Sequence, residues 1–511
     1  MVAKVISATI VGIEGMLVQV EVDITRGLPS FDIVGLPDTA VRESRERVRA
    51  AIKNSGFDFP IQRITINLAP ADIKKIGPQF DLAIAVGILA AQGLIPEKRL
   101  TNYLLAGELS LTGEVRKVKG ILPMALRARE EGIRGLVIPE VNYNEALLVE
   151  GIEVAAVRNL SDVLEFFIRG KKLKEDRLPL AATIESAVKD YKVDFADVKG
   201  QQEAKRALEV AAAGKHNIIM IGPPGSGKTM LAKRLRTILP PLTDEEALEL
   251  TKIYSTLGLI DAGSGLIRQR PFRTPHHSIS SAGLIGGGRI PEPGEVSLAH
   301  HGTLFLDELP EYKREVLELL RQPLEDGEVN IARVEMSVTF PARFMLVAAM
   351  NPCPCGYYGD DRHECNCTVP QINRYRGKVS GPLLDRIDIH IEVPGLNVEE
   401  ITSGDTRGES SLEIRKRVIA AHQLQLERYR REEFNYNSEL RGKALRMYCR
   451  VDNEGMFLLE KAIESLGLSA RGYDRILRLA RTIADLDKSE MIKSFHLAEA
   501  IQYRSLDRML S

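Results

Sequence analysis

A glycine-rich segment, 222-GPPGSGKT-229, carries residue types that bind phosphate. It fits the pattern G-x-x-x-x-G-K-[ST], follows the apolar run 217–221 and precedes the helical pattern 230–239, which is the context that a P-loop requires. In a P-loop, backbone N–H groups curl around phosphate at the start of the helix, the lysine neutralises phosphate oxygens and the threonine hydroxyl binds Mg²⁺. The predicted nucleotide-binding residues are Gly222, Pro223, Pro224, Gly225, Ser226, Gly227, Lys228 and Thr229.

Two further apolar runs end in residues that ATP hydrolysis needs. The run 303-TLFLDEL-309 ends in two carboxylates, Asp307 and Glu308, and the run 343-RFMLVAAMNP-352 ends in Asn351. Asp307 is predicted to bind Mg²⁺ through water, and Glu308 to orient the attacking water as a general base. The Asn351 amide can hydrogen-bond the γ-phosphate or that water, although an Asn-Pro pair also forms turns. Together with the P-loop, these residues predict an ATPase with ATP and Mg²⁺ as cofactors.

Four cysteines lie within fifteen positions, which suggests a metal site. They form two C-x-C pairs, Cys353 with Cys355 and Cys365 with Cys367. Four thiolates suffice for a tetrahedral structural Zn²⁺ with no open coordination position, although C-x-C is tighter than the usual C-x₂-C. His363 could substitute for one ligand, and reduced free thiols are the alternative interpretation. Because Cys353 follows Asn351 by two residues, a metal here could stiffen the loop that carries Asn351.

The three strand ends and the segments between them resemble an AAA+ ATPase of the magnesium-chelatase-like group. Within that group, four blocks are similar to the YifB/ComM family: 272-FRTPHHSISSAGLIGGG-288, 294-GEVSLAHHGTLFLDELPE-311, 320-LRQPLEDGEV-329 and 350-MNPCPCG-356. The N-terminal and C-terminal parts also fit this family, so the resemblance covers nearly the whole chain. It implies that Lys228 is the Walker A lysine, Asp307 and Glu308 the Walker B pair, and Asn351 the sensor-one residue.

The resemblance also assigns roles to two arginines. Arg386, in 381-GPLLDRIDIHIEV-393, matches the arginine finger that reaches the γ-phosphate of a neighbouring subunit. Arg471, in 469-SARGYDRILRLARTIADL-486, matches the sensor-two arginine of the helical lid. In GTPases a guanidinium on the developing phosphate charge is worth on the order of 10³ to 10⁵ in rate, whereas an isolated arginine more often forms a surface salt bridge. A finger that acts in trans requires a homo-oligomeric ring, for which the family implies a hexamer.

Two insertions in the core bear on the polymer that such a ring would thread. Residues 273–295, with His276, His277 and Arg289, resemble the family's insertion before the Walker B strand. Residues 326–340 alternate like a hairpin and resemble the pre-sensor hairpin that lines the central pore in this clade. If both face a pore, Arg289 and Arg333 are candidates to hold a phosphate backbone. A hairpin that merely packs on the core is an equally weighted alternative.

The resemblance implies a ComM-like DNA helicase with branch-migration activity in natural transformation or recombination, acting on single-stranded or branched DNA. The main alternative is an ATPase that remodels a protein partner, as the magnesium chelatase motor subunit does. A third alternative is an ATP-dependent peptidase. An ATPase assay with and without single-stranded DNA would separate these functions.

The N-terminal part resembles the Lon protease fold through residues 29–52, 77–85 and 110–139. Lon-type peptidases use a serine nucleophile and a lysine base. At the matching positions this chain has Gln79 and Leu122, so we expect an inactive peptidase domain that serves as a binding module. Arg42, Arg45 and Arg49 share one helix face that could contact phosphate, although a solvated, salt-bridged face is the favoured interpretation.

These sites must be positioned by several domains, because 511 residues at about 150 residues per domain predict three or four. We expect a Lon-like α+β domain at 1–172, a linker at 173–195, a P-loop AAA+ α/β core at 196–395 and a C-terminal helical lid at 396–511. The composition, 44% hydrophobic and 27% charged, is typical of a folded soluble chain. The formal net charge of -1 offers a polyanion no summed attraction, so local patches must provide it.

The sequence predicts a cytoplasmic protein that does not enter membranes. Its longest apolar stretches, such as 82–91, are shorter than the roughly 20 residues that a bilayer requires, and the N-terminus lacks a signal-peptide pattern. Clustered rather than dispersed cysteines also argue against a secreted disulfide framework. Cys449 stands alone and is expected to be an ordinary buried thiol.

Overall fold

The computed structural model describes residues 2–170, 193–261, 265–333, 336–360, 362–395, 408–466 and 469–504. Most of the expected linker and residues 396–407 of the expected lid lie outside this set. The chain divides into two compact units, which are Met1–Ala182 with Asp244–Ile267, and Thr183–Thr243 with Arg268–Ser511. The core and the lid therefore group in one unit. Residues 244–267, which we expected in the core, group with the N-terminal unit instead.

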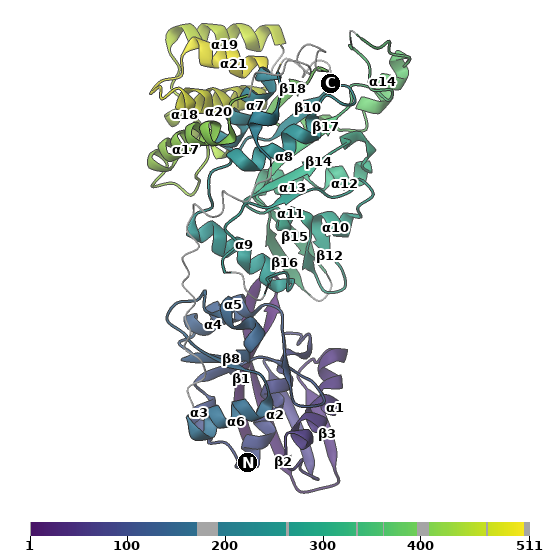
Figure 1. Ribbon diagram of the computed structural model, residues 1–511, viewed down its shortest axis with the longest axis vertical. Coiled ribbons are helices and arrows are strands. Elements are labelled where there is room, and N and C mark those ends of the chain that lie inside the picture. Colours follow the sequence, from purple (N-terminus) through teal and green to yellow (C-terminus); the bar gives the residue numbers. More distant parts are fainter. Residues whose placement is uncertain are drawn as a thin grey trace. The chain divides into compact units, whose positions relative to one another are not determined.

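The first unit contains a seven-stranded mixed sheet among its described residues (Figure 1). Its strands, in spatial order, are β3 (Ser30–Val34), β4 (Arg63–Ala69), β2 (Glu14–Thr25), β1 (Val2–Val11), β5 (Tyr103–Leu105), β8 (Gly135–Pro139) and β9 (Glu153–Val157). The pairs β1–β2 and β2–β4 are antiparallel, and the other neighbouring strands are parallel. Alternating apolar residues of β2, such as Val18, Val20 and Val22, are buried against the helices.

Helices cover this sheet, and a further helix, from residues 244–267, packs on one of them. The helices are α1 (Thr39–Asn54), α2 (Asp81–Ala91), α4 (Ile121–Glu130), α6 (Leu160–Arg169) and α9 (Asp244–Thr256). Helix α2 is apolar nearly all round and almost entirely buried, as expected for a central helix. Helix α9 packs against α4, and the Gly120 N–H donates to the Ser255 carbonyl at 2.9 Å. These long-range contacts explain why 244–267 groups with the first unit.

The second unit is built on a five-stranded sheet in which all neighbouring strands are parallel. Its spatial order is β11 (Phe272–Arg273), β14 (Thr303–Leu306), β17 (Met345–Met350), β10 (Ile218–Ile221) and β18 (Ile389–Glu392). Strands β10, β14 and β17 are buried along their whole length, which explains why they form continuous apolar runs in the sequence. Helices α7 (Gln202–Gly214) and α8 (Lys228–Ile238) pack on this sheet. The predicted α/β core with a parallel sheet is confirmed, and its arrangement is consistent with a P-loop AAA+ type domain.

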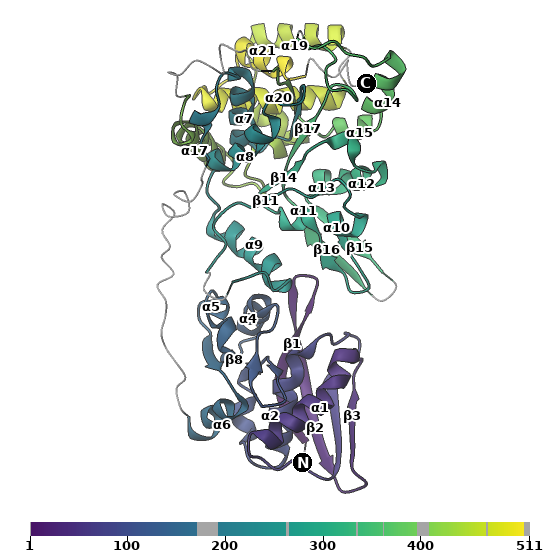
Figure 2. The same ribbon diagram turned by 45° about the vertical axis from the view of Figure 1, so that its right-hand side comes forward.

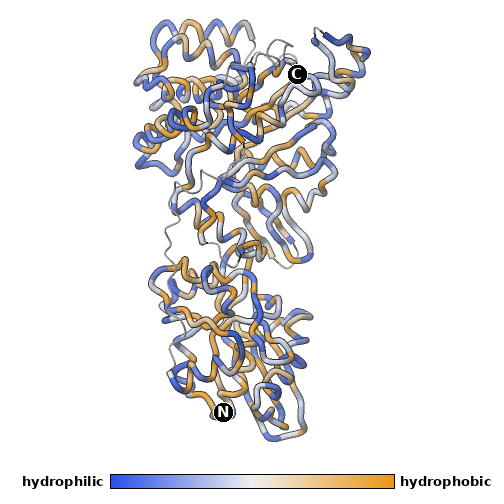
Figure 3. Tube along the Cα trace, in the orientation of Figure 1, coloured by the Kyte–Doolittle hydropathy of each residue, from blue (hydrophilic) through white to orange (hydrophobic). Residues whose placement is uncertain are grey.

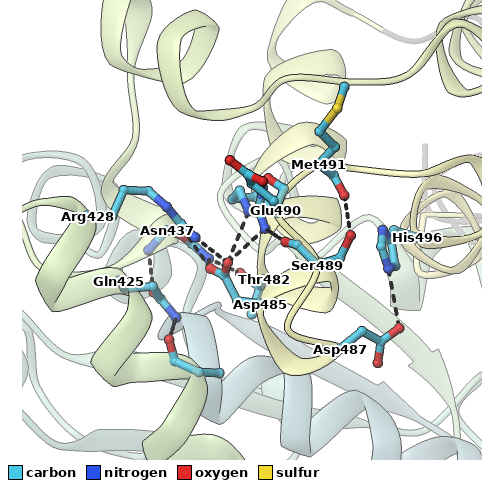
Figure 4. Close-up of polar contacts among 12 residues, drawn as sticks. Gln425, Arg428, Asn437, Thr482, Asp485, Asp487, Ser489, Glu490, Met491 and His496 are labelled. Atoms are coloured by element: carbon cyan, nitrogen blue, oxygen red, sulfur yellow. Dashed lines mark hydrogen bonds and ion pairs between the residues drawn. The ribbon is translucent and has the colours of Figure 1, made fainter.

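The C-terminal part of the second unit is helical, as predicted. Its helices are α17 (Ser411–Arg428), α18 (Gly442–Tyr448), α19 (Asn453–Leu466), α20 (Ala470–Leu486) and α21 (Ser494–Gln502). Hydrophilic and hydrophobic residues alternate along them, as expected for helices with one packed face (Figure 3). The buried Asp485 carboxylate accepts hydrogen bonds from Arg428, Arg481 and Asn437, and this network ties α17 to α20 (Figure 4). Among the described helices, none has the length and apolarity that a bilayer crossing requires.

Small elements project from the core between β11 and β17 (Figure 2). They are α10 (Ser281–Ile285), β12 (Gly286–Gly287), β13 (Glu292–Pro293), α11 (Glu295–Leu298), α12 (Arg314–Glu318), α13 (Arg321–Asp326), β15 (Glu328–Ala332) and β16 (Ser337–Pro341). Strands β15 and β16 pair antiparallel, with Val329 opposite Phe340. The hairpin predicted at 326–340 is therefore confirmed, while its tip at 334–335 lies outside the described residues.

Candidate active site

The parallel sheet of the second unit brings three polar strand ends to one edge. Gly222 directly follows β10, Asp307 follows β14 and Asn351 follows β17. These strands are neighbours and run in the same direction, so their carboxyl ends meet. In open parallel sheets ligands bind outside these carboxyl ends. The predicted P-loop, Walker B and sensor-one residues are therefore brought together as the sequence pattern requires.

The P-loop backbone has a shape that only glycine permits. Gly225 and Gly227 adopt left-handed φ values of 78° and 87°. A side-chain carbon on Gly222 would lie 2.1 Å from the Val393 carbonyl oxygen. The loop leads directly into α8, whose first N–H groups lack partners within the helix and point toward the loop. This glycine cradle at a helix N-terminus fits the phosphates of a nucleotide.

Lys228 lies at the centre of the site. Its ammonium group donates to the carbonyl oxygens of Gly222 and Pro223 at 2.7 and 2.8 Å, and to Asn351 Oδ1 at 3.2 Å. Burial lowers the pKa of Lys228 to about 8, although the negative charge of Asp307 opposes this shift. Lys228 thus joins the P-loop to the candidate sensor and carries a positive charge at neutral pH.

Thr229 and Asp307 form the part of the site that fits Mg²⁺. The Thr229 hydroxyl donates to Asp307 Oδ2 at 2.7 Å, so a hydroxyl and a carboxylate oxygen lie side by side. Hard oxygen donors of this kind are the ligands that Mg²⁺ prefers. The donor set therefore fits the Mg²⁺ ion that accompanies ATP in P-loop ATPases.

Glu308 faces a pocket next to these residues. Its side chain is 61% exposed, and its backbone has a φ of 52°, which is uncommon for a residue with a side chain. The pocket has a volume of about 410 Å³ and is lined by Glu308, Glu311, Asn351, Pro354, Gln371, Arg374, Tyr375 and Lys378. The candidate base and the candidate sensor therefore share one open cavity that water can enter.

His277 also lies beside the candidate base, a placement that we did not predict. Its Nδ1 atom is 3.8 Å from Glu308 Oε2, and its ring packs against that of His276 at a tilt of 35°, with centroids 4.0 Å apart. The Tyr312 hydroxyl donates to the Pro275 carbonyl at 2.6 Å and fixes this segment. The sequence signal was weak, because β11, which carries 275–277 to the same sheet edge, has only two residues.

Arg386 lies at the opposite edge of the sheet. It precedes β18, whereas the P-loop follows β10, and these two strands pair in parallel with Ile218 opposite Ile389. Four strand residues span about 13 Å, which separates the start of β18 from the end of β10. Arg386 therefore does not contact the P-loop of its own chain. The Arg386 side chain is only 8% exposed and forms an ion pair with Glu325. The salt-bridge alternative therefore holds within this single chain, and the finger role stays a prediction.

Arg471 is exposed in the first turn of α20, and no contact of the described residues joins it to the P-loop. Its role as sensor two also stays a prediction.

The two insertions with the predicted phosphate-contacting arginines lie against each other. A side-chain carbon on Gly287 of β12 would come within 3.5 Å of Arg333 Nη2, and one on Gly286 within 3.2 Å of Ile331 Cδ1. Both Arg289 and Arg333 are exposed. The structure therefore gathers two exposed positive charges from separate insertions.

In the N-terminal unit, the predicted likeness to Lon points to Gln79 and Leu122, and neither residue is a nucleophile or a base. The Gln79 amide donates to the Ile76 carbonyl at 2.6 Å. Leu122 is fully buried, and its N–H donates to Glu145 at 3.0 Å. Arg42, Arg45 and Arg49 are exposed on α1, and Arg45 lies 3.4 Å from Glu46. The likeness to Lon itself stays a prediction.

The four clustered cysteines meet in space, as a metal site requires. Their Sγ atoms all lie within 4.8 Å of one another. His363 does not join them, because its Nδ1 atom contacts Asp360 at 3.3 Å. Cys449 is buried in the helical part of the unit, as expected for an ordinary thiol.

Comparison with known proteins places these features in a family. Residues 194–401 match the family described as magnesium chelatase, subunit ChlI, while 20–142 and 408–504 match the families described as subunit ChlI of Mg-chelatase and as magnesium chelatase, subunit ChlI C-terminal. The chain is 46% identical to the competence protein ComM of Haemophilus influenzae, over 99% of this chain and 98% of that protein. It is 45% identical to YifB of Salmonella typhimurium, over 98% and 96%. It is 24% identical to the magnesium-chelatase 38 kDa subunit of Rhodobacter capsulatus, over 59% and 84%.

Proposed function

The chain belongs to the ComM and YifB family of magnesium-chelatase-like AAA+ ATPases, and we propose that it is a ring-forming motor that acts on DNA. The observation that carries the ATPase part is the bonded set at one sheet edge, in which Lys228 contacts Asn351 and Thr229 contacts Asp307. Lys228 and the P-loop N–H groups hold the phosphates, and Thr229 and Asp307 supply ligands for Mg²⁺, which neutralises phosphate charge when bound.

Hydrolysis in this proposal proceeds by attack of water on the γ-phosphorus of ATP. Glu308, in its open pocket, accepts a proton from the attacking water, and Asn351 orients that water or the γ-phosphate. The bond to the β–γ bridging oxygen breaks, and ADP and phosphate leave. Arg386 of a neighbouring protomer supplies charge to the transferred phosphoryl group, as the family resemblance implies, and Arg471 serves as sensor two. The ring is a homo-oligomer for which we propose six subunits.

DNA is the polymer that we propose for this motor. Exposed Arg289 and Arg333 lie on insertions that pack together, and their charge suits a phosphate backbone. The name of the 46% identical relative refers to competence, which favours DNA over a protein substrate. We therefore propose helicase or branch-migration activity in transformation or recombination, located in the cytoplasm, with the N-terminal unit as an inactive Lon-like binding module.

The cofactors of this activity are ATP and Mg²⁺. A Zn²⁺ ion at the four cysteines would be structural, since a site closed by four thiolates leaves no position for substrate.

The rival function is an ATPase that remodels a protein partner. The 24% identity to the magnesium-chelatase 38 kDa subunit favours it, although that match covers only 59% of this chain.

The two functions differ in what stimulates the ATPase. We expect single-stranded or branched DNA to raise the rate, and the double variant Arg289→Ala/Arg333→Ala to lose that stimulation. Arg446→Ala, which removes an exposed charge from α18, serves as the matched control and should retain it. Stimulation by a protein partner alone would refute the DNA proposal.

A further inference from the structure

We propose that Cys353, Cys355, Cys365 and Cys367 bind one Zn²⁺ ion, and that this ion braces the two walls of the pocket that holds Glu308 and Asn351. The first part stands on the thiol geometry alone. The second part rests on the proposed ATPase function, because it concerns how that site is held in shape.

The thiol separations are those of a single tetrahedral ion. Cys353 Sγ lies 3.3 Å from Cys355 Sγ and 3.8 Å from Cys365 Sγ, and the latter two are 3.6 Å apart. Zinc–sulfur bonds of about 2.3 Å at tetrahedral angles place sulfurs about 3.8 Å apart. A multi-iron cluster does not fit as well, because its thiolates bind different iron atoms and therefore lie farther from one another.

The four ligands come in two pairs from two chain segments. Cys353 and Cys355 belong to the loop that follows β17 and begins with Asn351. Cys365 and Cys367 directly precede α14 (Val369–Arg376), which carries Arg374 and Tyr375 of the pocket wall. An ion bound to all four thiolates therefore ties the sensor loop to α14.

The first cysteine loop also rests on the P-loop. A side-chain carbon on Gly356 would lie 2.5 Å from Pro224 Cδ, so the two backbones approach closely. Arg376 of α14 donates to the Pro352 carbonyl at 3.0 Å, which is a second link between the same two segments. Pro354, between the first two cysteines, lines the pocket with Glu308 and Asn351. Loss of the ion would free a loop that carries the candidate sensor and touches the phosphate cradle.

Metal analysis of the purified full-length protein tests the site without reference to activity. We expect one zinc per chain in the wild type and in Cys449→Ala, which removes the buried thiol of the helical part, and none in Cys365→Ala/Cys367→Ala. Cobalt exchanged into the wild type should give the visible absorption of a tetrahedral tetrathiolate. A zinc-free wild type with four alkylatable thiols, or a disulfide between any two of them, would overturn the site.

The bracing role is tested by kinetics on the same variants. We expect kcat for ATP to fall about 10-fold or more in the double variant, and to stay at the wild-type value in Cys449→Ala. Cys367→His, which replaces one zinc ligand by another, should keep the metal and have a kcat well above that of the double variant, and it decides the case if the double variant does not fold. A metal-free variant with an unchanged kcat would overturn the brace. A zinc-loaded wild type without ATPase activity would instead refute the proposed function and leave the metal site intact.

Discussion

In the parallel sheet of the second unit, the edge where the strands end and the edge where they begin differ in how many groups of the candidate site they bring into contact. At the edge after β10, Lys228 contacts Asn351 and Thr229 contacts Asp307, so that the candidate phosphate and Mg²⁺ groups form one bonded set. At the edge before β18, Arg386 is paired with Glu325, and none of the described residues forms a phosphate-binding loop beside it. One chain therefore gathers the candidate phosphate and Mg²⁺ groups at one edge and holds its candidate finger at the other, out of reach of its own P-loop.

The Arg386 environment suits a charge that changes partners. A guanidinium that is largely removed from water needs a counter-ion, and Glu325 supplies it within the chain. The Arg386 Nε atom makes no hydrogen bond within the described part of the chain, so one donor remains for an acceptor outside it. In a ring, the γ-phosphate of a neighbour's ATP could take over from Glu325.

The largest effect is expected from Arg386→Ala, which removes the guanidinium of the candidate finger before β18. Hydrolysis should fall by on the order of 10³ or more, as when an arginine finger is removed, while ATP affinity stays close to that of the wild type. Steady-state ATPase rates and equilibrium nucleotide binding measure the two quantities. Full-rate hydrolysis by this variant would show that Arg386 is not an arginine finger.

Glu308→Gln should have the next largest effect, because it removes the candidate base from the edge that carries the P-loop and leaves every phosphate contact in place. We expect hydrolysis to fall by on the order of 10² to 10⁴ with ATP still bound, since the amide cannot accept the proton. Glu311→Gln, a carboxylate of the same pocket, is the matched control and should hydrolyse ATP near the wild-type rate. Normal turnover by Glu308→Gln would remove this residue from the role of base.

A smaller effect is expected from pH, through Lys228. Its pKa of about 8 must rise when phosphate binds, so ATP affinity is fully present below that pH and is lost as the pH rises above it. The loss should approach about tenfold per pH unit until the pKa of the complex is reached. Lys228→Arg keeps its charge and should bind ATP with little pH dependence. A wild-type affinity that is flat between about pH 7 and pH 10 would contradict this assignment.

The smallest effect is expected from Glu325→Gln. This variant removes the ion-pair partner of Arg386 and keeps Arg386 and all candidate residues of the P-loop edge. The free energy of unfolding should fall by about 1 kcal/mol, because the pair is partly exposed. Hydrolysis at saturating ATP should not fall. Chemical denaturation and ATPase rates measure the two effects, and a rate as low as that of Arg386→Ala would mean that the ion pair itself is needed for catalysis.

The sequence predicted the P-loop edge well because its signals are local. Gly222, Asp307 and Asn351 each follow an apolar run, and a parallel sheet brings such ends together without further information. The hairpin at 326–340 was likewise visible as alternation along a short segment. Residues whose partners adjoin them in sequence, or whose place follows from sheet topology, are therefore within reach of sequence analysis.

The remaining features depend on pairings between distant residues. Glu325 lies 61 positions from Arg386, and no local pattern joins them. His277 reaches Glu308 through a strand of only two residues, which is too short to recognise. Residues 244–267 group with the N-terminal unit through contacts such as Ser255 with Gly120, more than one hundred positions away along the chain.

A mixing experiment tests most directly whether the two edges complete each other between protomers. Lys228→Ala keeps its arginine and loses its phosphate site, whereas Arg386→Ala keeps the phosphate site and loses its arginine. Each variant alone should be nearly inactive. In random mixed rings, half of the protomers bind ATP and half of their neighbours donate an arginine, so the mixture should recover about a quarter of the wild-type rate. A mixture that co-assembles and stays as inactive as its components would contradict the account.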